Sequence, residues 1–408
     1  MIGSAPGAVV LPILPILIAV AAQPLASAQT SSPAAAPQQV ERQDAPISPK
    51  ELRGAIDQLG KLDFSTRMNA SRTVRRASAA QAVPALIEAV TAHADGYVRF
   101  RALVLLSGFN DPRTRSVVLP LLADANDRVR ASAYAWVEHN RTPEAIPQLL
   151  AALETEESEF VRPSLTRALA AYADDPRARD AMRALVNRGQ DFFRSVAIEA
   201  IGDYKGAYAS AELTKVAQLE GPLQDDAVLA LGKIGDKRAL GLFAELQRSA
   251  PRDVQPSIAA AICLLGVNCG AHKGYLTESI NFAIENSGFQ ELLRPAVGGM
   301  AAIAAVGDES ALRWLVEAGG PSRDPARAPI ALGIGLVALR NPALTLRVVE
   351  QQPDASPAVE LLREAFDMLE EDYEEEQFFV LVRRAYWGAA EDTPTRRAAG
   401  LLIKQLEF

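Results

Sequence analysis

Residues 129–139 read VRASAYAWVEH: an apolar residue, an arginine, and then apolar residues at helical spacing. Four other segments share this pattern, with threonine in the first place of one of them: TRMNASRTV from Thr66, VRFRALVLLSG from Val98, VRPSLTRALAA from Val161 and FRSVAIEAIGD from Phe193. Their arginines stand at positions 67, 99, 130, 162 and 194, so successive copies follow one another at a nearly constant interval. A fixed period of this length, about 32 residues, predicts a repeat protein.

A second helical segment precedes several of these copies. Examples are AVPALIEAV at 82–90, AIPQLLAAL at 145–153, ARDAMRALV at 178–186 and ALGLFAELQ at 239–247. Pro84 and Pro147 precede the arginine of the following copy by the same interval, and this position suits the first turn of a helix. One pair of helices cannot bury its apolar stripe alone, whereas stacked pairs bury each other's stripes. The sequence therefore predicts an all-α chain of stacked helix pairs.

These segments, above all VRASAYAWV, AIPQLLAAL and ALGKIGDKRAL (230–240), resemble HEAT repeats of the short bacterial type that is also found in phycobilisome lyases. The resemblance covers residues 50–408. It implies a right-handed α–α superhelix, a HEAT/armadillo-like solenoid of about ten helix pairs, which we expect to be elongated. The spacing between Ile258 and Ala296 is longer than the regular period, so we divide the solenoid into a regular half, 50–270, and an irregular C-terminal half, 271–408.

The first residues are typical of export. Residues 9–22 are apolar but too short to span a bilayer, and Ala26-Ser27-Ala28 suits signal peptidase. We expect a signal peptide over 1–28 that is cleaved after Ala28, a flexible Pro/Ala-rich linker over 29–49, and a periplasmic or secreted protein without a membrane span in its mature chain. Because the first eight residues carry no Lys or Arg, an uncleaved anchor is the alternative.

Composition narrows the class of partner. The 408 residues include 42 Lys plus Arg and 50 Asp plus Glu, a net charge of −8. Nucleic-acid binding needs a basic face, so we expect no nucleic acid and a protein partner instead.

On the HEAT-repeat geometry the second helices line a concave surface. The resemblance places Phe100, Arg101, Tyr134, Arg167 and Glu199 on that surface, where aromatic and arginine side chains would bind a protein. Packing of Phe100 and Tyr134 between neighbouring repeats is the alternative.

The recurring arginines form a predicted structural ladder, Arg99, Arg130, Arg162 and Arg194. We expect each to pair with an acid three or four residues earlier, namely Asp95, Asp127, Glu159 and Asp191. An anion-binding rail is the alternative function.

Charge is distributed unevenly along the chain. Residues 50–80 hold seven basic and three acidic residues, a balance of +4, whereas residues 350–376 hold one basic and eleven acidic, a balance of −10. The run MLEEDYEEEQFF at 368–379 predicts a solvated turn, and a patch for a cation or a basic partner is the alternative. Ends of opposite charge would also favour head-to-tail association.

The sequence contains few residues of the kinds that carry chemistry. His93, His139 and His272 show no paired-ligand spacing, and the His–Glu pairs that HEAT-repeat di-iron hydroxylases carry on several repeats do not occur, so we expect no metal and no cofactor. Cys263 and Cys269 would form a disulfide if the helix ended at Gly266 and the chain turned back.

The sequence therefore predicts a non-catalytic protein–protein interaction scaffold of the bacterial cell envelope that binds its partner on the concave helix face. The resemblance to phycobilisome lyases leaves a bilin-lyase-like enzyme, or another HEAT-repeat enzyme, as the alternative.

Overall fold

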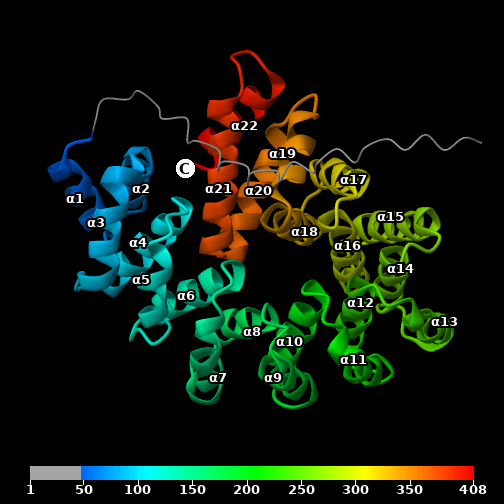
Figure 1. Ribbon diagram of the computed structural model, residues 1–408. Coiled ribbons are helices and arrows are strands. Elements are labelled where there is room, and N and C mark those ends of the chain that lie inside the picture. Colours follow the sequence, from blue (N-terminus) through cyan, green and yellow to red (C-terminus); the bar gives the residue numbers. More distant parts are fainter. Residues whose placement is uncertain (1–46) are drawn as a thin grey trace, which may run out of the picture. The chain divides into compact units, whose positions relative to one another are not determined.

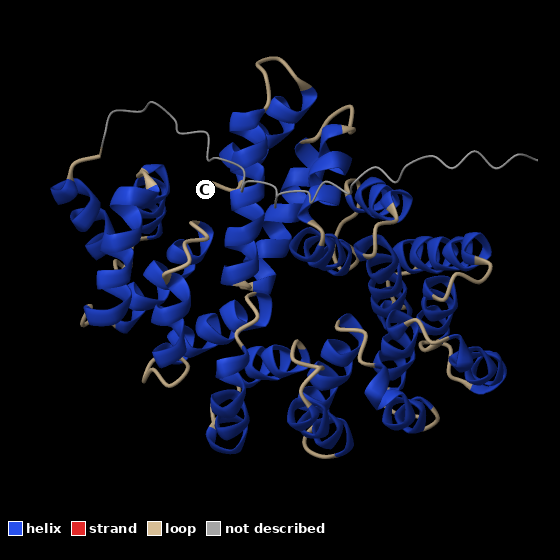
Figure 2. Cartoon of the chain, viewed as in Figure 1, coloured by secondary structure: helices blue, strands red, loops and turns tan. Residues whose placement is uncertain are grey.

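The computed structural model describes residues 47–408, which belong to one compact unit, and it is helical without any strand among these residues (Figures 1 and 2). The predicted signal peptide and the linker up to residue 46 lie outside the described residues. The α-helices are α1 (Pro49–Gln58), α2 (Phe64–Arg76), α3 (Ala79–Ala92), α4 (Gly96–Gly108), α5 (Thr114–Leu121), α6 (Asp127–His139), α7 (Ile146–Thr155), α8 (Arg162–Ala170), α9 (Pro176–Asn187), α10 (Asp191–Asp203), α11 (Ser210–Ala217), α12 (Gln224–Ile234), α13 (Leu240–Ser249), α14 (Gln255–Leu264), α15 (Cys269–Glu285), α16 (Gln290–Ala305), α17 (Glu309–Gly319), α18 (Arg327–Arg340), α19 (Pro342–Glu350), α20 (Ser356–Leu369), α21 (Asp372–Gly388) and α22 (Pro394–Gln405). Short 3₁₀ helices precede α7, α11 and α13, at Pro143–Ala145, Ala207–Ala209 and Lys237–Ala239.

Short polar side chains begin many of these helices. The Asp63 carboxylate accepts a hydrogen bond from the Thr66 amide (2.7 Å), and the Asn126 side chain accepts from the amides of Arg128 and Val129. Each such cap satisfies a backbone N–H that has no partner within its own helix. The chain can therefore turn sharply at the ends of these short helices without leaving the donors unpaired.

The helices stack in pairs, as the period of the sequence predicts. The even-numbered helices from α4 to α20 pack against one another and line the inner side, while α5, α7, α9, α11 and α13 lie outside them (Figure 1). The outer helices bury one narrow stripe, such as Ala178, Met182 and Val186 of α9, which recur at every fourth position. The all-α solenoid of the sequence prediction is confirmed.

Inner helices pack on several sides at once and approach one another closely. In α14, every residue from Pro256 to Cys263 is buried. Small residues make this closeness possible, since a Cβ added at Gly232 of α12 would lie 2.5 Å from the Cα atom of Ala261 in α14.

The apolar core forms two clusters that meet in α14. Ile258 and Ile262 belong to the cluster of the first half, whereas Ala260 and Cys263 belong to that of the second. The chain turns at Gly266, whose φ is +76°, and a disulfide joins Cys263 to Cys269. The boundary that we placed near residue 270 follows directly after this turn.

Helix α21 departs from the regular stack. Its first turns lie against α4 and α6 (Figure 1), and Tyr373 belongs to the apolar core of the first half. The guanidinium of Arg72 on α2 also donates to the carbonyl of Glu407 at the C-terminal end (3.1 Å). The array of residues 47–408 thus closes on itself, so the expectation that the solenoid is elongated is wrong for this unit.

Among the described residues, no single helix has both the length and the apolarity needed to cross a bilayer. Helices α18 and α19 reach that threshold only when counted together, and they are bent by 118° at the break between them.

Candidate functional site

Two of the five residues that we placed on the concave face are core residues. Phe100 and Tyr134 are only 2% and 1% exposed, and the Tyr134 hydroxyl donates to the Leu122 carbonyl (2.9 Å). The prediction that these rings face outward is wrong. Inner helices contact a neighbour on each side, so more of their circumference is buried than a single stripe would suggest.

Arg101 and Arg167 do lie on the inner face, where they bind acids of the same chain. Arg101 donates to Asp372 (Nη1–Oδ1 2.5 Å), and Arg167 makes a two-pronged contact with Glu371 (3.0 and 2.8 Å). Parallel hydrogen bonds of this kind are among the strongest between protein side chains. Glu199 of α10 is exposed.

The acidic run at 368–379 is therefore not a solvated turn. Besides Asp372 and Glu371, a third carboxylate of this run also contacts arginine. The Glu376 carboxylate is buried and contacts Arg75 (2.5 Å) and Arg383 (3.0 Å). Burial alone would raise the pKa of Glu376, but the two guanidinium groups lower it overall. The opposite charges at the two ends of the sequence, which suggested association between molecules, meet here within one chain.

A second set of ion pairs crosses the inner side. Asp203, at the end of α10, contacts Lys233 of α12 (2.8 Å) and Arg340 of α18 (2.9 Å). Burial opposes ionisation, but these two cations hold the pKa of Asp203 below its usual range. The inner face thus carries several internal charge pairs, and those of Arg101, Arg167 and Arg340 join the two halves.

The arginine ladder has structural contacts. Arg99 and Arg130 donate to carbonyls that follow the preceding outer helix, those of His93 and Asp124, at 3.1 and 2.8 Å. Arg130 also makes a two-pronged contact with Glu156 of the next repeat. These contacts satisfy carbonyls near a helix end and connect neighbouring repeats.

The acids that pair with the ladder differ in part from those we expected. Arg130 and Arg194 contact Asp127 and Asp191, three residues earlier. Arg99 instead contacts Asp124 of the following turn, since Asp95 caps α4. Arg162 lies over the ring of Phe193 (4.5 Å) rather than beside Glu159.

A row of side chains lies at the N-terminal ends of the inner helices, and the sequence did not predict it as a site. Two residues before each ladder arginine of four consecutive repeats stand Tyr97, Arg128, Phe160 and Phe192, which we call the edge stripe. Phe160 and Phe192 are 48% and 61% exposed, and the guanidinium of Arg128 lies 5.3 Å from the centre of the Phe160 ring. The same repeated segments that show the arginine ladder also show these residues, two positions before each arginine.

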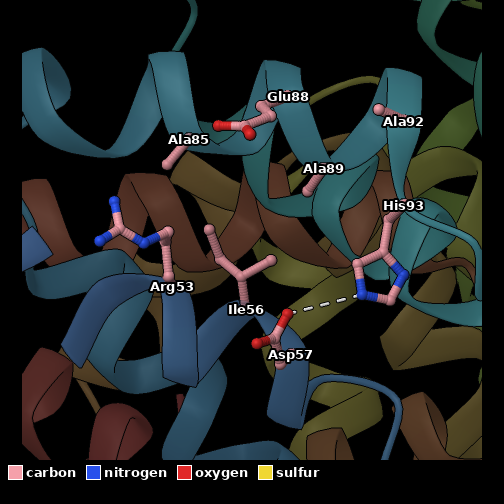
Figure 3. A pocket seen from close by; sticks show the side chains of 8 residues that line it. All are labelled: Arg53, Ile56, Asp57, Ala85, Glu88, Ala89, Ala92 and His93. Carbon is pink, nitrogen blue, oxygen red and sulfur yellow. Dashed lines mark ion pairs between the residues drawn. The ribbon is translucent and has the colours of Figure 1, made fainter. Parts of the chain in front are cut away.

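Two cavities in the described chain are small. One, of about 230 Å³, lies between α1 and α3, and among its lining residues the His93 ring lies 3.5 Å from the Asp57 carboxylate (Figure 3). The other, of about 250 Å³, lies between α19 and α22. Ligand pockets usually measure about 300 to 1,000 Å³, so both cavities fall below this range.

Stacked helix pairs with a repeating arginine position define a helical-repeat solenoid protein. Residues 52–138 and 118–202 match the family model of HEAT repeats, so this part of the chain is similar to HEAT repeats. No curated protein matches the sequence.

Solved structures with the same kind of fold are similar at low identity. Escherichia coli YibA is 17% identical over 54% of this chain and 82% of its own, with a TM-score of 0.39. The complex of CpcE and CpcF of phycocyanin lyase from Nostoc is 18% identical over 82% of this chain and 100% of that chain (TM-score 0.25). Importin beta is 12% identical over 88% and 62% (TM-score 0.39).

Proposed function

We propose that this protein is a non-catalytic interaction scaffold of the bacterial cell envelope, and that it binds a partner protein along the edge stripe. The observation that carries the proposal is an exposed phenylalanine, Phe160 and then Phe192, at the same position of two consecutive repeats. Large exposed aromatic groups beside arginine are typical of residues that dominate the energy of protein interfaces.

The edge stripe is favoured over the inner face because α21 already occupies the inner arginines. A partner on that face would have to displace Asp372 from Arg101 and Glu371 from Arg167. At the edge stripe, by contrast, Phe160 and Phe192 are exposed within the described chain.

The stripe also suggests the form of its partner. Inner helices pack about 10 Å apart, so four positions cover about 30 Å. About nine residues of extended chain have this length. We expect an extended segment with apolar side chains for the phenylalanines and a carboxylate for Arg128. Nothing among the described residues favours the bilin-lyase alternative.

Export is the second part of the proposal. It is supported by the sequence of residues 1–28 and by the bonded pair Cys263–Cys269, since disulfides persist in oxidising compartments.

Substituting Phe160→Ala together with Phe192→Ala should remove partner capture at constant helicity. Each lost aromatic anchor costs about 2 kcal/mol, so the pair should weaken binding more than a hundredfold. The measurement is crosslinking in intact bacterial cells followed by mass spectrometry of the periplasmic fraction, where we expect the mature chain to begin at Gln29.

The matched control is Val306→Ala with Leu336→Ala, which removes two exposed apolar side chains outside the stripe. Equal partner recovery from the stripe variant and the wild type would exclude the stripe as the binding site. Recovery of the chain only from the cytoplasm would exclude the envelope location.

A further inference from the structure

Three potential metal ligands meet where α21 contacts α6. One carboxylate oxygen each from Glu138 and Glu374, and a ring nitrogen of His139, lie within 4.8 Å of one another. Glu374 is far from His139 in the sequence, so no spacing along the chain could reveal this group.

The histidine is oriented as a metal ligand would be. Its Nδ1 lies 2.9 Å from the Ala135 carbonyl, and a carbonyl can only accept, so Nδ1 carries the proton. The lone pair of the neutral ring is then on Nε2, which lies 3.9 Å from Oε1 of Glu374. The Tyr373 ring stacks on the imidazole at 5.0 Å and holds its plane. A backbone acceptor on the far nitrogen is the usual support of a metal-bound histidine.

Both carboxylates lack hydrogen bonds that burial requires. The Glu138 side chain is 0% exposed; its Oε1 accepts from the Tyr204 hydroxyl (2.7 Å), whereas its Oε2 accepts no hydrogen bond. Oε2 of Glu374 is likewise buried without a hydrogen bond. A buried carboxylate oxygen without a partner is costly, and a bound cation would satisfy it.

The nearby arginine, Arg167, directs its hydrogen bonds to another carboxylate. Arg167 directs both terminal nitrogens to Glu371, and its Nε lies 3.7 Å from Oε2 of Glu138, beyond hydrogen-bond distance. Glu138 and Glu371 share the one guanidinium of Arg167 at ion-pair distance, and Glu374 adds a third carboxylate, so the group has an excess of acidic side chains that a divalent cation would offset.

We propose that Glu138, His139 and Glu374 bind a first-row divalent transition-metal ion, Zn²⁺ in the first instance, which fastens α21 to α6. One imidazole nitrogen with two carboxylate oxygens is a ligand set that zinc accepts. Tetrahedral ligands at about 2.1 Å from zinc are about 3.4 Å apart, so the side chains need to close in by about an ångström from their present separation. Solvent or a partner group supplies the remaining position.

The test is calorimetric titration of Zn²⁺ into the full-length, tag-free protein after treatment with a chelator. We expect one ion per chain, and we expect His139→Ala and Glu374→Gln each to weaken binding at least tenfold. Zinc should also raise the Tm of the wild type but not that of the variants. Glu375→Gln and His93→Gln are matched controls outside the cluster and should bind as the wild type does.

Co²⁺ absorption of the wild type provides a readout that does not depend on the folding of any variant. We expect the visible d–d absorption bands of four- or five-coordinate Co²⁺, and we expect one equivalent of Zn²⁺ to abolish them. The proposal is overturned if the wild type binds no stoichiometric ion, if Co²⁺ remains octahedral, or if His139→Ala binds as tightly as the wild type.

Discussion

Replacing Glu376 with alanine should destabilise the protein by about 3 to 5 kcal/mol, the range for breaking a buried ion pair. The Glu376 carboxylate is buried between Arg75 of α2 and Arg383 of α21, and both guanidinium groups hydrogen-bond to it. The variant leaves two partly or fully buried positive charges facing each other without a counter-ion. The loss combines their desolvation with their mutual repulsion.

Urea unfolding followed by far-ultraviolet circular dichroism measures this loss. Asp57→Ala is the control, since its carboxylate is exposed and exposed ion pairs contribute about 0 to 1 kcal/mol. If Glu376→Ala and Asp57→Ala had the same midpoint, the contact of α21 with α2 would be absent in solution.

Gly232→Val should cost about 3 kcal/mol or more, because an added Cβ would lie 2.5 Å from a backbone atom of α14 and the two inner helices would have to separate. Thermal unfolding followed by circular dichroism measures the effect.

Gly241→Ala is the matched control. Its added methyl group meets no atom within 4 Å on the outer helix α13, so the gain in helix propensity should stabilise by about 0.5 to 1 kcal/mol. If replacement of Gly232 destabilises the protein and replacement of Gly241 stabilises it, then close packing of the inner helices, rather than helix propensity, requires glycine at position 232. A wild-type Tm for Gly232→Val would contradict the stack as described.

The repeats could be predicted because their information is local. The ladder arginines recur at a nearly constant period, and the same period fixes which helices stack. The sequence could not decide between exposure of Tyr134 and its packing between repeats, because periodicity identifies an apolar stripe but does not reveal that an inner helix has neighbours on both sides.

The site could not be predicted for a different reason. Arg101 and Asp372 are 271 residues apart, as is typical of the contacts that close the array. The pattern at 368–379 shows only a run of acidic residues, and such a run is equally compatible with a solvated turn. Only the closure of the array shows that arginines of the first repeats face these carboxylates, and that His139 and Glu138 face Glu374.

The central claim is that the acidic start of α21 lies on the arginines of the inner face. Amide hydrogen exchange of the peptide that covers 372–377 tests it most directly, in the wild type, in Arg101→Asp and in Arg101→Asp combined with Asp372→Arg. We expect that the single charge reversal speeds exchange of this peptide at least tenfold, that the double reversal largely restores the slow exchange, and that the exchange of α12 peptides does not change. Equal exchange of this peptide in all three proteins would contradict the account.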